Sequence, residues 1–118
     1  MMSQDDKPLR WMLDTLTSPP VGKDALIEAG FLFRLLQRGE SLRMPDSRPM
    51  PVIGRRVHEL RIDDAERSVS WRIGYRIDDD AILVVDWFEK KTPTTPATVI
   101  ARCRRRLREY DHGQEETS

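Results

Sequence analysis

The sequence predicts an α+β domain in which helices, including a C-terminal helix, pack on one face of an antiparallel sheet of about four strands. Two observations predict this class. Between residues 57 and 89, apolar and polar residues alternate with a period of two, which is typical of half-buried strands. Before and after that region, apolar residues recur at steps of three and four, which is typical of amphipathic helices.

Three segments are expected before the strand region. Residues 9–13 form a short apolar run that fits a strand or a short helical turn, and we favour the strand; the turn-forming residues 17–20 end it. Residues 23–38 carry their apolar side chains on one helical face, and Gly39 is a typical stop after a helix. Residues 40–56 contain three prolines and show no period, which predicts an irregular connection.

Three strands are then expected at residues 57–63, 68–78 and 81–89. The acidic residues 78–80 form a tight turn that joins the last two strands into an antiparallel hairpin.

A last helix is expected after the sheet. Pro93 and Pro96 end the strand region, and either Thr95 or Thr98 can cap a helix that runs to about Tyr110. We expect one domain at residues 1–111, followed by a flexible acidic tail at residues 112–118.

The overall charge does not predict a nucleic-acid partner, because 20 basic side chains balance 20 acidic ones. Basic residues nevertheless outnumber acidic ones between residues 54 and 110, which favours a local basic site. The lone cysteine, Cys103, excludes an internal disulfide and a cysteine-based zinc cluster. No signal peptide or membrane span is predicted, so we expect a soluble cytoplasmic protein.

Five cations form the candidate site. Strand alternation places two arginines on the face opposite the aromatic residues of the second long strand, and we expect helices to leave that face open. A third arginine lies in the strand before it, and two lysines follow the last strand. These cations are Arg61, Arg72, Arg76, Lys90 and Lys91.

Each candidate also has a simpler interpretation. Arginines on a solvated strand face often pair with a carboxylate, here Glu59 or Asp86, and lysines at a strand end protect the sheet edge. Trp87 has the parity of Leu83 and Val85, which favours the core, although its place beside the lysines also allows base stacking.

Other chemistry has little support in the sequence. The patterns of a Ser/His/Asp triad and of a glycine-rich phosphate loop are absent, and His58 and His112 lack the spacing of metal ligands. We therefore expect no metal and no cofactor. The arginine run at residues 102–108 fits a solvated helix face or a surface that binds phosphate or an acidic partner.

Several motifs together resemble the phage-derived branch of the RelE/HigB toxins, within the RelE/ParE superfamily. They occur in order as EAGFLFRLLQRGESLRMPDSRPMPVIG, HELRI, WRIGYRI, DAILVVDWFEKKTPTTP and VIARCRRRLREYD. The resemblance covers roughly residues 9–111.

The resemblance implies a microbial RNase-like fold and a toxin of a type II toxin-antitoxin pair. Similar toxins cleave mRNA on the ribosome through attack of the ribose 2′-hydroxyl on the adjacent phosphate, without a metal. The implied partners are mRNA, the ribosome and a helix-turn-helix antitoxin.

Site roles follow from the resemblance by position. It implies Arg61 and Lys91 as transition-state stabilisers and Arg72 as the next catalytic candidate. Lys90, Arg76 and Trp87 are the candidate phosphate- or RNA-binding residues. Relatives often have histidine two residues before the phenylalanine of the F-x-KK motif, where this chain has Asp86, the candidate proton acceptor.

Two alternatives share the implied fold. One is a gyrase poison of the ParE kind, which binds a protein and does not cut RNA. The other is a phage-derived protein that binds RNA or its antitoxin and has lost catalysis; the absence of the histidine keeps this alternative open.

Overall fold

A computed structural model describes residues 6–13 and 21–117 of the chain. The predicted turn at residues 17–20 lies outside the described residues. The elements are β1 (Leu9–Trp11), α1 (Lys23–Gln37), β2 (Ser47–Pro49), β3 (Val57–Asp64), β4 (Val69–Ile77), β5 (Ile82–Glu89) and α2 (Ala97–Thr117). The α+β class is confirmed, and so is the strand at the start of the chain.

The described strands form one five-stranded sheet in the order β1-β5-β4-β3-β2. All neighbours are antiparallel except β1, which pairs with β5 in parallel. The sequence predicts about four strands and places β2 in an irregular connection. This strand has three residues, too few to show a period, and Pro49 is tolerated because β2 lies at the sheet edge.

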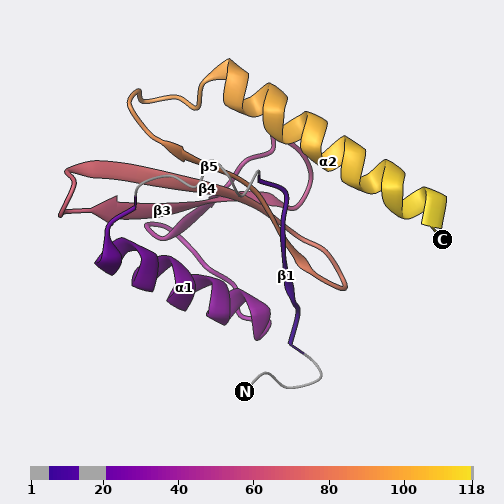
Figure 1. Cartoon of the computed structure of the whole chain (residues 1–118), viewed down its shortest axis with the longest axis horizontal. Coiled ribbons are helices and arrows are strands. Elements are labelled where there is room, and N and C mark those ends of the chain that lie inside the picture. Colours follow the sequence, from indigo (N-terminus) through magenta and orange to yellow (C-terminus); the bar gives the residue numbers. More distant parts are fainter. Residues whose placement is uncertain (1–5, 14–20, 118) are drawn as a thin grey trace.

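The two helices cover opposite faces of the sheet (Figure 1). Ile82 and Val84 of β5 pack in the cluster that contains α1, whereas Leu83 and Val85 pack in the cluster that contains α2. The prediction that helices pack on one face is therefore wrong. The central strands are apolar on both faces, and burying both requires a layer on each side.

The prediction of an open face for Arg72 and Arg76 is wrong for the same reason. Both arginines point to the side that α2 covers, and each is 8% exposed. A buried guanidinium needs charged or polar partners, so these two side chains take part in the internal ion pairs described below.

A bulge in β5 changes the alternation of its side chains. Gly74 pairs with Asp86 while the next residue, Tyr75, pairs with Val84, so Val85 has no partner of its own in β4. Simple alternation predicts that Trp87 packs on the same face as Leu83 and Val85. Because of the bulge, Trp87 packs instead against the cluster that contains α1.

Asp64 connects the end of β3 to the start of α1. Its Oδ2 accepts hydrogen bonds from the backbone N–H of Gly22 at 2.7 Å and from Nε1 of Trp71 at 3.0 Å, and its Oδ1 accepts one from the N–H of Arg67 at 3.3 Å. The Gly22 bond, with smaller help from the other two, holds the pKa of Asp64 below its usual value although the carboxylate is buried.

Arg76 connects β4 to the second half of α2. Its guanidinium donates to both carboxylate oxygens of Asp111 at 2.7 and 3.0 Å, and to both oxygens of Asp78 at 2.7 and 2.8 Å. These bonds lower the pKa of Asp111. The sequence predicts a helix end near Tyr110, but α2 continues to Thr117 because Asp111 is fixed to the sheet and no proline follows.

The start of α2 also differs from the prediction. The helix begins at Ala97, directly after Pro96, so neither Thr95 nor Thr98 occupies the capping position. Neither described helix has the combination of length and apolar composition that crossing a membrane requires.

Gly22→Ala tests the close approach at the Asp64 anchor. A Cβ at this position would lie 2.5 Å from Oδ1 of Asp64 and 2.8 Å from Oε2 of Glu66, so the buried carboxylate would have to shift. We expect a loss of about 1–3 kcal/mol in the free energy of unfolding, measured by urea denaturation. The matched control is Gly30→Ala, where the new methyl meets open space inside α1 and should stabilise by up to about 1 kcal/mol. Equal effects at both positions would contradict the anchor.

Asp64 and Asp111 make the free energy of unfolding depend on pH in the acidic range. Both have a pKa below its ordinary value in the folded state, so their contribution is present above about pH 4, the unfolded pKa, and is lost as the pH falls towards the folded pKa. We expect the free energy of unfolding to decrease below about pH 4, and Asp111→Asn to flatten that decrease. Asp79→Asn, in the exposed part of the nearby turn, is the control; an unchanged slope in Asp111→Asn would refute the assignment.

Candidate anion-binding site

A buried carboxylate lies at the centre of the candidate site. Glu59 of β3 points to the α2 side of the sheet and is 1% exposed. Its Oε1 accepts a hydrogen bond from Nε of Arg48 at 3.2 Å and lies 3.6 Å from Nε of Arg72. Its Oε2 accepts a hydrogen bond from the hydroxyl of Thr95 at 3.2 Å. Three segments distant in sequence thus meet at one side chain.

We call the basic residues around this carboxylate, together with Glu59 itself, the Glu59 cluster. Its members are Arg48, Glu59, Arg61, Arg72 and Lys90. Strand register explains why they meet: Arg48 pairs with Glu59 across β2 and β3, and Arg61 pairs with Arg72 across β3 and β4. Two arginines directly opposite each other repel, and the buried carboxylate offsets that repulsion.

The cluster carries more positive than negative charge. Burial lowers the pKa of Arg72, and repulsion from Arg61 lowers it further, while Glu59 opposes both. Burial likewise lowers the pKa of Lys90, with additional repulsion from Arg48, Arg72 and Arg61. Four cations therefore lie around Glu59, with Asp63 also close to Arg72, and a bound anion would relieve the repulsion among the cations.

A depression of about 270 Å³ opens beside the cluster. It is lined by Arg61 and Arg72 together with Glu28, Asp46, Asp63 and Pro45. Partial burial, with repulsion from Asp46 and Asp63, raises the pKa of Glu28. The depression thus combines two guanidinium groups with three carboxylates, of which Glu28 takes up a proton more readily than usual. No group of three or more His, Cys, Asp or Glu side chains in the described part of the chain is arranged to hold a metal ion.

The structure brings together three of the predicted cations, Arg61, Arg72 and Lys90. Lys91 follows Lys90 but points outward, with its side chain 74% exposed and its Nζ 3.8 Å from Glu89. Arg76 lies at the other end of β4 and is held by Asp78 and Asp111.

Two predicted residues lie away from the cluster. Trp87 points to the α1 face, so it cannot stack on a base held at the cluster. Asp86 is buried beneath α2, where Arg102 donates to its Oδ2 at 2.5 and 3.0 Å and Arg106 donates to its Oδ1 at 3.0 Å. Both oxygens are engaged by guanidinium groups, an arrangement that favours a structural role over proton transfer.

Sequence reasoning missed three contributors to this site. Arg48 lies in the segment without a period, and its role depends on a strand that the pattern does not reveal. The sequence predicts Thr95 as one of two possible helix caps, whereas its hydroxyl contacts Glu59. Glu28 belongs to the polar side of α1 and reaches the arginines only after the helix packs on the sheet.

The buried thiol of Cys103 is unsuited to nucleophilic chemistry. It is 1% exposed, and burial, together with the charge of Asp86, raises its pKa to about 12.

Comparison with known protein families finds a match over most of the chain. The family model described as phage-derived protein Gp49-like (DUF891) matches residues 22–108, from the start of α1 to the middle of α2. No curated protein and no solved structure matches the chain significantly. The matched region contains the whole Glu59 cluster and most of the described fold, and the chain therefore belongs to the phage-derived Gp49-like family.

Proposed function

We propose that this protein is the toxin of a type II toxin-antitoxin pair and that it cleaves mRNA on the ribosome. Membership of the Gp49-like family and the resemblance of its motifs to RelE/HigB toxins support this function. The observation that carries the proposal is the group of four cations around Glu59, of which Arg61 and Arg72 line the depression beside it. Such a site fits a phosphodiester.

The proposed reaction needs orientation, charge stabilisation and proton transfer. The ribose 2′-oxygen forms a bond to phosphorus, and the bond from phosphorus to the 5′-oxygen breaks. The products are a 2′,3′-cyclic phosphate and a 5′-hydroxyl. The 2′-hydroxyl gives up a proton to an acceptor, and the 5′-oxygen takes one from a donor. Cations near the phosphate stabilise the charge that develops on its oxygens.

Arg61 and Arg72 line the depression and contact the phosphate in this proposal, and Lys90 adds positive charge close to both arginines. Lys91 is exposed and meets the RNA from the solvent side. Glu59 acts as a positioning residue, because it holds Arg48 and Arg72 in place and is itself inaccessible to substrate.

Glu28 is a better candidate for the proton acceptor than Asp86. It lines the same depression as the two arginines, and its raised pKa brings it closer to neutral pH, where a general base works best. Asp86, by contrast, is buried between two arginines of α2.

One observation favours a second candidate function, binding of RNA or of an antitoxin without cleavage. Asp86 occupies the place of the histidine found in relatives, and its ion pairs leave no free oxygen for catalysis. In both functions an antitoxin of the helix-turn-helix type, encoded by a neighbouring gene, is the expected partner.

Expression in growing bacteria, followed by mapping of mRNA 5′ ends, tests cleavage directly. We expect growth arrest and new 5′ ends within translated codons. Arg61→Ala combined with Lys91→Ala should abolish both effects, because removing one stabilising donor alone commonly costs about 10²-fold to 10³-fold in rate.

The control replaces two exposed arginines outside the site, Arg38 and Arg105, with alanine and should remain toxic. Intact mRNA with DNA damage would instead identify a gyrase poison, and intact mRNA in arrested cells without DNA damage would indicate binding alone.

Glu28→Gln tests the proton acceptor in a single-turnover assay with purified ribosomes and mRNA. The carboxylate must be deprotonated to accept a proton, so the wild-type rate should rise with pH through the raised pKa of Glu28. We expect the variant to lose about 10²-fold in rate and to lose this rise. Glu40→Gln, which removes an exposed carboxylate just after α1, is the control. A variant that keeps the same pH profile would exclude Glu28.

A further inference from the structure

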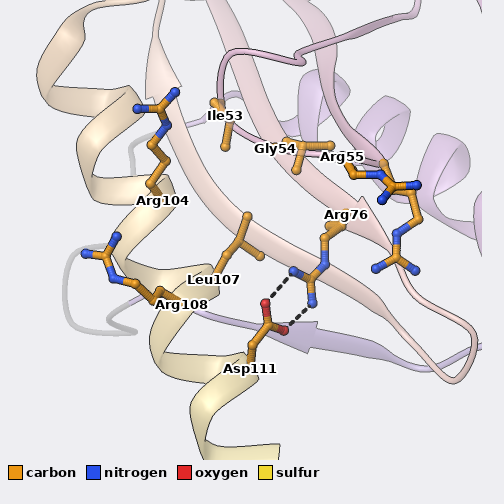
Figure 2. A pocket seen from close by; sticks show the side chains of 10 residues that line it. Ile53, Gly54, Arg55, Arg76, Arg104, Leu107, Arg108 and Asp111 are labelled. Atoms are coloured by element: carbon orange, nitrogen blue, oxygen red, sulfur yellow. Dashed lines mark hydrogen bonds and ion pairs between the residues drawn. The ribbon is translucent and has the colours of Figure 1, made fainter.

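A groove lined by several arginines lies on the α2 side of the sheet, and its lining is separate from the Glu59 cluster. It has a volume of about 400 Å³ and is formed by residues 53–57 and the middle of α2 (Figure 2). Arg55, Arg56, Arg104 and Arg108 surround it, while Ile53 and Leu107 form an aliphatic floor. None of its lining residues belongs to the Glu59 cluster.

Among the described residues, Arg55, Arg104 and Arg108 of this groove have no acidic partner, whereas Arg56 and Arg76 each have at least one. Arg55 and Arg108 form no ion pair with any residue that the structure describes, and Arg104 donates to the carbonyl oxygen of Val52. Arg56 is half exposed and lies 3.8 Å from Asp78. Arg104 and Arg108 are four residues apart on α2, a spacing at which like charges destabilise a helix. A complementary anion would remove this cost.

The wall of the groove already shows which chemistry complements an arginine here. Arg76 reaches into the groove and binds Asp111 through two parallel N–H to oxygen contacts at 2.7 and 3.0 Å (Figure 2). This geometry is the bidentate recognition that a guanidinium gives a carboxylate. The remaining arginines offer the same donors to solvent.

We propose that this groove binds an acidic segment of a protein partner. An aliphatic side chain of that segment packs on Ile53 and Leu107, and flanking Asp or Glu carboxylates bind Arg55 and Arg108. Charge complementarity argues for an acidic occupant, and the lining selects peptide over RNA. Among the residues that the structure describes, no aromatic side chain lines the groove, so these residues provide no stacking platform of the kind on which single-stranded bases are commonly held. The inference is independent of nuclease activity.

Fluorescence anisotropy tests the proposal with a short labelled peptide in which glutamate alternates with leucine. A second peptide, with serine in place of leucine, tests the aliphatic floor, and a single-stranded RNA of equal charge tests the competing occupant. We expect the glutamate-leucine peptide to bind most tightly. Arg55→Gln together with Arg108→Gln should weaken that binding by roughly tenfold or more.

The matched control is Arg38→Gln together with Arg105→Gln, which removes the same charge from exposed positions outside the groove. Equal weakening in both double variants would show nonspecific attraction and overturn the proposal. Stronger binding of RNA, lost in the groove variant alone, would assign the groove to nucleic acid. Equal affinity for the serine peptide would refute the aliphatic floor. The four substituted arginines, two in each double variant, are all exposed. Circular dichroism and thermal unfolding should therefore show that each variant folds.

Discussion

The negative charge of Glu59 is the constraint on which both the sheet edge and the candidate site depend. A carboxylate almost without access to water is costly to bury unless cations and donors surround it. Arg48, Arg72 and Thr95 meet this requirement from β2, β4 and the segment before α2. The same ion pairs that keep the acid in the interior also collect cations at one place. The candidate site is therefore a consequence of how the fold satisfies one buried charge.

The second constraint is a sheet that is buried on both faces. The run of apolar residues in β5 requires a helix on each side, and α2 covers the face that carries the arginines of β4. The bulge at Val85 then turns Asp86 towards α2, where Arg102 and Arg106 bind it. Polar contacts thus fix α2 along its length, beside an apolar stripe that includes Cys103 and Leu107. This explains how a helix rich in arginine packs on a sheet.

Periodicity in the sequence was enough to predict α1, β3, β4, β5 and α2, because each has several turns or alternations in which to show its pattern. It could not predict β2, whose three residues form a strand only through pairing with β3. Nor could it predict the bulge at Val85, which arises because Gly74 pairs with Asp86 while Tyr75 pairs with Val84. Site prediction shows the same limit. Arg61 and Arg72 are found from alternation within strands, whereas Arg48 and Glu28 join them through contacts between distant segments.

Charges that balance over the whole sequence are distributed unevenly in the fold. Three acids are buried inside the fold, each at most 3% exposed, and they accept hydrogen bonds from distant segments. They are Glu59, Asp64 and Asp86. Arg72 and Arg76 are buried as well, and other arginines gather beside them, at the Glu59 cluster and at the groove beside α2. A chain without net charge can therefore gather arginines at two places on one fold, although most acids that the structure describes stay exposed. In this fold, the local arrangement of charges determines what a partner encounters, and the total charge of the sequence does not.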